Sequence, residues 1–360
     1  MPSCVPRFLH SSFMMHPNRL PAFLIPSLKI IAVAMVLGWI LYRFPENHWR
    51  PLLSASKDWR FLFLALSTAL LAHLVSFWRW KILLGALGLP MRLIEACRLG
   101  FLGSTLNLVS VGSVGGDVFK AVAAARLAPG KRTEVVTSVL VDRAIGLLGL
   151  VLVASFSLSL ATALSPTMRW IWSAALTLSA LGSLALLLVL LFGRWLPTHR
   201  FQKLPWIGQI VFRVANSCMV FYGRPWLVVQ MIVTSLMVHS LLTTSCWLIS
   251  IALYHSEPNL IPTLAQHFQA IPPAMAAATL PITPGGVGIQ ELLIQTLFAE
   301  IPEVSSAFSG LVVATTYRAI LVVIALIGAV VYLTGNERRL VAQDLSATTN
   351  AALGAKTNQE

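Results

Sequence analysis

The sequence predicts an all-α polytopic membrane protein, with about six transmembrane helices and two oppositely oriented re-entrant hairpins that form an inverted repeat. Three observations support this fold class. Hydrophobic residues make up 57% of the 360 residues and charged residues only 11%, whereas a soluble domain carries roughly a quarter charged residues. Glycine-rich breaks interrupt two of the apolar stretches. The basic residues gather in alternate loops.

The apolar runs define the expected helices. A helix needs about 20 apolar residues to cross a bilayer, and six runs qualify, at 24–44, 60–80, 134–162, 170–192, 226–253 and 305–333. Two further stretches, 93–128 and 263–299, contain the breaks. Each is expected to form two short legs and an irregular turn. Irregular backbone is tolerated at membrane depth only where it is buried in protein or lines a cavity.

The loop charges predict the orientation. Most of the 26 lysines and arginines lie at the two ends of the chain and in 79–98, 118–133 and 194–224. The positive-inside rule places these segments in the cytoplasm. The hairpin 93–128 then starts and ends inside, whereas 263–299 starts and ends outside. The domain organisation expected is a cytoplasmic segment 1–23, a membrane domain 24–335 with repeat units 60–162 and 226–333, and a polar cytoplasmic tail 336–360.

Composition also argues against several functions. The net charge of +13 comes from cations in short loops between apolar runs, which indicates topology and anionic-lipid contact rather than nucleic-acid binding. The four cysteines show no CxxC spacing and the eight histidines no HxxxH pair, so we expect no metal and no cofactor. No pattern typical of a catalytic apparatus stands out, so we expect no enzyme activity.

The two breaks supply candidate binding residues. A glycine-rich turn that leads into a helix N-terminus presents unpaired N–H groups and the positive end of the helix dipole, which suit an anion. Glycine at such a turn also permits positive φ and a close backbone approach. The alternative is that the glycines only let the chain reverse. The candidates are Asn107, Gly115, Gly116, Asp117 and Lys120 in the first break and Pro284, Gly285, Gly286, Gly288 and Glu291 in the second.

A lone arginine follows each break by about 26 residues, Arg143 after Asp117 and Arg318 after Glu291. An arginine at the centre of a membrane helix costs at least ~2.5 kcal/mol, so such residues normally face a cavity and pair with something. Two roles remain open: internal salt bridges to the two acids, or binding of an anionic head group. Asp142 must bond elsewhere, because neighbours at i and i+1 do not share a helix face. Corresponding interrupted segments in two halves of a membrane protein point to a transport site.

The runs Leu102–Lys120, Ser138–Leu147 and Leu280–Glu291 resemble the lysylphosphatidylglycerol synthase transmembrane-region family, which comprises flippase-like integral membrane proteins. The resemblance implies lipid translocation. In the lysyl-lipid synthase members this region is fused to a cytosolic aminoacyl-transferase domain, which we do not expect here, so synthase activity is not implied. Val111 stands where the family usually has proline, and Lys120 where arginine is common.

The first functional hypothesis is therefore a multi-pass lipid flippase or transporter of the inner, cytoplasmic membrane that moves an anionic or lipid-linked substrate. The resemblance implies membrane lipids as partners, with hopanoid and polyprenyl-linked lipids among those associated with similar stand-alone members. A homo-oligomer or a partner from lipid biosynthesis remains open. Two alternatives are a membrane enzyme of lipid or glycan assembly and an accessory subunit that needs another protein for activity.

Overall fold

The computed structural model describes residues 56–109, 115–127, 131–192, 219–280 and 286–334, and the described part of the chain is helical, without a strand. Five of its helices are long and apolar enough to cross a membrane: α3 (Trp59–Ala86), α6 (Arg132–Ser159), α7 (Pro166–Phe192), α10 (Pro225–Tyr254) and α13 (Gly310–Thr334). They correspond to five of the six predicted spans. The sixth, 24–44, lies outside the described residues, as do the segment 1–23 and the tail 336–360.

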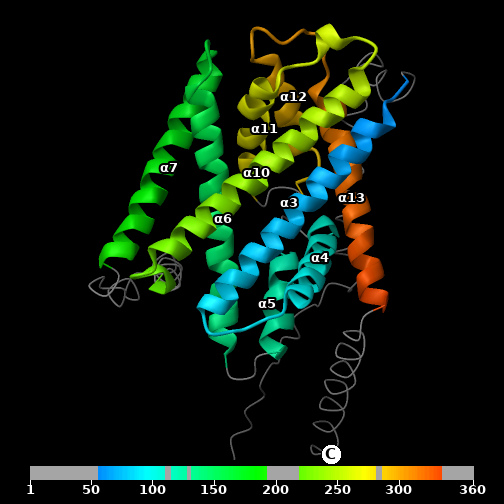
Figure 1. Cartoon of the computed structure of the whole chain (residues 1–360). Coiled ribbons are helices and arrows are strands. Elements are labelled where there is room, and N and C mark those ends of the chain that lie inside the picture. Colours follow the sequence, from blue (N-terminus) through cyan, green and yellow to red (C-terminus); the bar gives the residue numbers. More distant parts are fainter. Residues whose placement is uncertain (1–55, 110–114, 128–130, 193–218, 281–285, 335–360) are drawn as a thin grey trace, which may run out of the picture.

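Four shorter helices form two packed pairs. These are α4 (Leu93–Val109) with α5 (Gly115–Leu127), and α11 (Leu264–Ala278) with α12 (Ile289–Ala299). Each has fewer than the about 20 residues that a spanning helix needs. The first pair begins and ends at the lower end of Figure 1, whereas the second begins and ends at the upper end. The short 3-10 helices η2 (Met219–Phe221) and η3 (Pro258–Leu260) complete the described elements.

Local capping explains where two helices begin. The Asp58 side chain accepts a hydrogen bond from the Arg60 backbone N–H at the start of α3. At the start of α11, Thr263 and Gln266 form a reciprocal capping box, which satisfies two N–H groups that have no partner within the helix. Proline at Pro272 and Pro273 interrupts the hydrogen-bond ladder of α11, because proline has no N–H to donate.

Small residues and hydroxyl groups join the helices. Ala65, Ala69 and Ala72 follow one stripe of α3 and are fully buried, and α3 packs against α10 over much of its length (Figure 1). Ser245 of α10 donates a hydrogen bond to the Ala65 carbonyl at 2.8 Å. Thr105 similarly ties α4 to α13 through the Ala325 carbonyl at 2.8 Å. Close backbone approach and interhelical hydrogen bonds are the interactions expected where lipid weakens the hydrophobic drive between helices.

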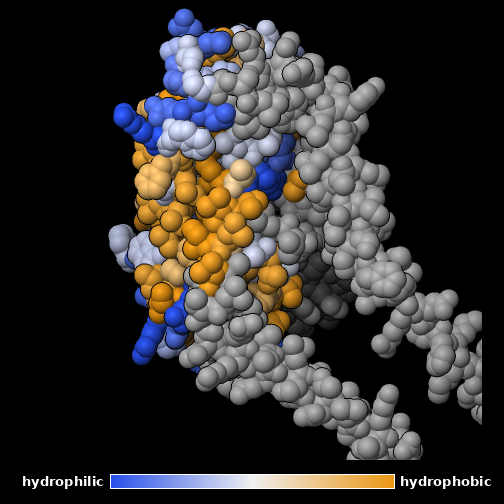
Figure 2. All heavy atoms as spheres, turned by 90° about the vertical axis from the view of Figure 1, so that its right-hand side faces the viewer, coloured by the Kyte–Doolittle hydropathy of each residue, from blue (hydrophilic) through white to orange (hydrophobic). Residues whose placement is uncertain are grey.

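The outer surface is apolar. Large hydrophobic side chains are exposed on α7, such as Leu178 and Leu181, and on α13, such as Leu326. Figure 2 shows hydrophobic residues gathered over the middle of the face that it presents, with hydrophilic residues towards the two ends. An exposed apolar area this extensive is unusual for a soluble monomer, and it matches a surface that lipid surrounds.

The α4–α5 pair depends on a close backbone contact. A Cβ built on Gly116 would overlap the carbonyl oxygen of Gly103 and lie 2.7 Å from Oδ1 of Asn107. Of the two reasons expected for glycine at this turn, the close backbone approach is confirmed and positive φ is not, because the φ angle of Gly116 is not in the left-handed region. Gly116 is required because α4 and α5 approach too closely for a side chain.

We predict that Gly116→Ala lowers the thermal unfolding temperature of the purified protein, because overpacking a close contact typically costs about 1–3 kcal/mol. Gly85→Ala in α3 is the matched control, since a Cβ there meets nothing within 4 Å. Unfolding in detergent, followed by intrinsic fluorescence, measures both. Equal transitions for the two variants would show that the α4–α5 contact is not tight in solution.

Candidate functional site

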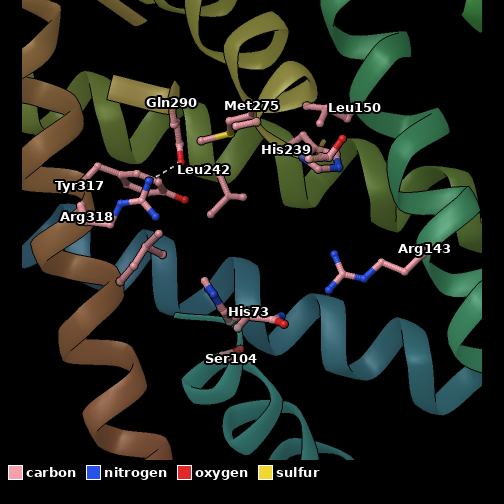
Figure 3. A pocket seen from close by; sticks show the side chains of 14 residues that line it. His73, Ser104, Arg143, Leu150, His239, Leu242, Met275, Gln290, Tyr317 and Arg318 are labelled. Atoms are coloured by element: carbon pink, nitrogen blue, oxygen red, sulfur yellow. Dashed lines mark hydrogen bonds between the residues drawn. The ribbon is translucent and has the colours of Figure 1, made fainter. Parts of the chain in front are cut away.

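A large cavity lies between the helices. It consists of two adjoining parts of about 620 Å³ and 300 Å³. Seven residues line both parts: His73, Ser104, Asn107, Arg143, Leu150, His239 and Thr279. We call the combined space the central cavity. The larger part extends to Asp117 and Lys120 of α5, and the smaller to Gln290 of α12 and Arg318 of α13. Both predicted arginines therefore reach one space, from α6 and α13 (Figure 3).

The first break folds around two side-chain interactions. Asn107, near the end of α4, accepts a hydrogen bond from the Gly116 N–H at 2.8 Å, so it caps the start of α5. Asp117 forms an ion pair with Arg143, and Lys120 lies 3.9 Å from the same carboxylate. The predicted salt bridge between Asp117 and Arg143 is present. The Arg143 side chain nevertheless remains 44% exposed, so it is accessible to a second anion.

The arginine of the second break is less exposed than the arginine of the first. Arg318 Nε donates to Glu291 Oε1 at 2.8 Å, and Glu291 Oε2 accepts from the Gly288 N–H at 2.7 Å. A second guanidinium nitrogen donates to Gln290 Oε1 at 3.2 Å and to the Gly286 carbonyl at 3.3 Å. Only 16% of the Arg318 side chain is exposed. This arginine thus fastens the beginning of α12 to the middle of α13.

Two glycines of the second break have the backbone conformation that the sequence predicts. Gly286 has a φ of 69° and Gly288 a φ of 87°, values that residues other than glycine rarely adopt. The Gly286 carbonyl and the Gly288 N–H face the charged groups as a result of this turn. Pro284 and Gly285 lie outside the described residues.

Arg79 is a site residue that the sequence analysis missed. It was assigned to the cytoplasmic segment 79–98, but α3 continues to Ala86 and places Arg79 inside the protein, with 5% of its side chain exposed. Its Nε donates to Asp142 at 2.9 Å and its Nη1 to Ser235 at 2.6 Å. Asp142 therefore finds its partner on α3. The sequence offered as a signal only the two tryptophans that flank this arginine, Trp78 and Trp80.

Lys120 falls in the basic segment 118–133, and the sequence analysis also named it as a candidate binding residue. It lies on α5 and lines the central cavity. Its ammonium lies 5.8 Å from the centre of the Phe77 ring and 5.9 Å from that of Trp80. A cation over aromatic faces is stabilised electrostatically. Lys120 therefore supplies a further positive charge at the site.

Neutral polar side chains complete the cavity wall, and the sequence analysis did not single them out. Gln290 contacts Arg318. His73 hydrogen-bonds with the Ala69 carbonyl and His239 with the Gly146 carbonyl, both at 2.9 Å. Each histidine stands alone in an apolar span, without the spacing typical of metal ligands, so the pattern gave no motif to recognise.

The charges around the cavity do not balance. Arg79, Lys120, Arg143 and Arg318 are cations, and the carboxylates near them are Asp117, Asp142 and Glu291. The described part of the site thus carries one positive charge in excess. Charges interact more strongly here than in bulk water because protein replaces part of the surrounding water. An anionic group with one negative charge complements this arrangement.

The predicted site residues that the structure describes fall into three groups. Asn107, Asp117, Lys120, Asp142, Arg143 and Arg318 line the central cavity. Gly116, Gly286, Gly288 and Glu291 support these residues through hydrogen bonds. Gly115 is the first residue of α5. In the described ranges, no three histidine, cysteine or acidic side chains lie close enough together to hold a metal ion.

The long apolar helices and the lipid-compatible surface define a multi-pass membrane protein. Residues 27–328 match the family described as the lysylphosphatidylglycerol synthase TM region, and the chain belongs to this family. This confirms the resemblance seen in the three sequence motifs. A comparison with curated proteins finds no match.

We predict that Arg79→Met strongly destabilises the protein, because it leaves Asp142 buried without its cation. Breaking one partner of a buried ion pair costs about 3–5 kcal/mol. The double variant Arg79→Met/Asp142→Leu should recover much of this loss, since no unpaired charge then remains. Lys81→Met, on the same helix but away from the cavity, is the control. A double variant no more stable than Arg79→Met in thermal unfolding would contradict the pairing.

Proposed function

We propose that this protein is a lipid flippase or lipid transporter that moves an anionic or lipid-linked substrate across the cytoplasmic, inner membrane. One observation carries the proposal: Arg143 and Arg318, which follow the two corresponding breaks in the sequence, line the same cavity. The excess positive charge there suits an anionic head group. The apolar outer surface leaves the hydrocarbon part of such a substrate in lipid.

The proposed architecture has six spans and two re-entrant hairpins in an inverted repeat. The opposite placement of the α4–α5 and α11–α12 pairs supports it (Figure 1). So does the repeated ion pair, in which an acid in the first turn of the second leg binds an arginine of the next spanning helix. Inverted repeats with a binding site at their interface are common in transporters and permit alternating access from the two sides.

Exchange of partners gives the arginines a role in translocation. An arriving phosphate or phosphodiester would compete with Asp117 for Arg143, whose guanidinium offers several donors in a planar fork. Lys120 remains close to Asp117 and would partly neutralise the displaced carboxylate. Because the arginine exchanges one anion for another, head-group binding gains only a modest free energy. A substrate that must leave on the other side requires such moderate binding.

The alternative function is a membrane enzyme or an accessory subunit of lipid or glycan assembly. An enzyme of this kind would need carboxylates free to bind a metal or move a proton. Asp117, Asp142 and Glu291 are each engaged by a cation instead. This arrangement favours transport over catalysis, so we propose that membrane lipids are substrates to be moved and not chemically changed.

The topology can be tested by cysteine labelling. We predict that Lys131→Cys, between α5 and α6, is cytoplasmic and that Pro302→Cys, between α12 and α13, is external. In a background with the native cysteines replaced by serine, an impermeant maleimide should label only Pro302→Cys in intact cells. Permeabilised cells provide the control, since both should then react. Labelling of both positions, or of neither, in intact cells would contradict the opposed hairpins.

The proposed anion contact predicts a loss of transport when either arginine is removed. Arg143→Ala and Arg318→Ala should each reduce the flux of fluorescent phosphatidylglycerol in proteoliposomes roughly tenfold or more, because a hydrogen bond to a charged group contributes about 1.5–3 kcal/mol. Lysine should rescue only part of the flux, since it lacks the planar fork. Flux is normalised to folded protein.

Arg169→Ala is the matched control, because Arg169 is an exposed arginine at the start of α7. Its flux should remain near that of the wild type. The double variant Arg143→Ala/Asp117→Ala separates the two roles left open by the sequence. Recovery of flux in the double variant would show that the pair is structural and that Arg143 does not bind the substrate.

A further inference from the structure

Two histidines occupy central positions in the cavity wall. His73 of α3 and His239 of α10 line both parts of the central cavity. Figure 3 shows the two rings approaching this space from different helices, with the arginines on either side. Ionisable residues within membrane helices are rare and commonly serve ion or proton pathways. The role proposed for the arginines leaves these two rings unexplained.

Hydrogen bonding determines the proton position on each neutral ring. A carbonyl oxygen only accepts, so Nδ1–H of His73 donates to Ala69 and Nε2–H of His239 donates to Gly146. The other nitrogen of each ring then carries a lone pair. In His239 this nitrogen, Nδ1, is buried and has no hydrogen-bond partner among the described residues. A buried polar atom without a partner is uncommon and requires an explanation.

The surrounding charges make protonation of these rings dependent on the substrate. The charged and titratable groups that face the cavity are Arg79 of α3, Asp117 and Lys120 of α5, Asp142 and Arg143 of α6, and Tyr317 and Arg318 of α13, with Glu291 of α12 behind Arg318. The positive excess disfavours a further cation. An anionic head group removes that excess, and an imidazolium is then less unfavourable.

We propose that His73 and His239 form a proton-binding site, and that arrival of an anionic head group in the central cavity is coupled to uptake of one proton. This inference rests on the proposed function, because it takes the central cavity as the head-group site. The proton comes from water and binds a ring nitrogen lone pair, and no other bond changes. Release of the anion on the other side releases the proton, so the two move together.

Linkage fixes the sign of the pH dependence. If the occupied state holds more protons than the empty state, affinity for the anion rises as pH falls, and the anion equally favours protonation. Dihexanoyl phosphatidylglycerol is a suitable probe, since its phosphodiester does not titrate between pH 5.5 and 8. For one proton taken up, affinity should rise by at most about tenfold per pH unit. Calorimetry in bis-Tris and in Tris measures the proton directly, because the two buffers differ in ionisation enthalpy and neither is an anion that competes for the site.

Conservative variants assign the effect to the two rings. His239→Gln and His73→Asn keep an N–H that can reach the same helix carbonyl, but neither side chain can be protonated. The pH dependence and the buffer-dependent heat should decrease in each variant and disappear in the double variant. His255→Gln is the matched control, because His255 lies at the end of α10 and does not line the cavity.

The outcomes separate this inference from the proposed function. Binding by the wild type that is independent of pH and of buffer would overturn the proton site while leaving the flippase proposal standing. Failure of the wild type to bind the probe at any pH would contradict both. Unchanged pH dependence in the double variant would place the proton elsewhere and overturn the assignment to these histidines. If a variant unfolds, the buffer comparison on the wild type still decides whether a proton is taken up.

Discussion

The need of each acidic side chain around the central cavity for a cationic partner shapes the rest of this structure. An unpaired charge in a low-dielectric interior is so unfavourable that its partner fixes the position of a neighbouring helix. Arg79 and Asp142 join α3 to α6, while Arg143 binds the first turn of α5. Arg318 similarly holds the first turn of α12. The cavity, the two pairs of short helices and the long helices are therefore positioned by the same small set of contacts.

The two arginine–acid pairs are similar in kind but differ in burial. Arg318 shares its guanidinium among Glu291, Gln290 and a backbone carbonyl, and it is largely covered. Arg143 is far more exposed, and the larger part of the cavity lies on its side. In the described conformation, the half with Arg143 is thus the more accessible one.

Much of this organisation could be predicted because hydropathy and glycine content report directly on membrane helices and their interruptions. The five described spans follow from these signals, and the two arginine–acid pairs were one of the two roles left open for Arg143 and Arg318. Arg79 was not predicted as a site residue, since hydropathy places a helix end only approximately and a cation near that end resembles a loop residue. For Gly116 the close backbone approach was expected, but the sequence does not show that α4 is the helix that approaches it. The two histidines could not be identified from the sequence, because neither belongs to a recognisable motif. Their contacts in the folded protein were needed.

The same pairing rule links the arginines to the histidines. If the cavity held as many carboxylates as cations, an anionic head group would introduce an uncompensated charge, and the site would repel it. With one cation in excess, a head group with a single negative charge is compensated, and the excess that opposed a further positive charge is removed. Protonation of the cavity wall is then less unfavourable. His73 and His239 present nitrogen lone pairs in this wall that can take the proton. The charge carried by the substrate and the number of protons bound would then be set by one electrostatic balance.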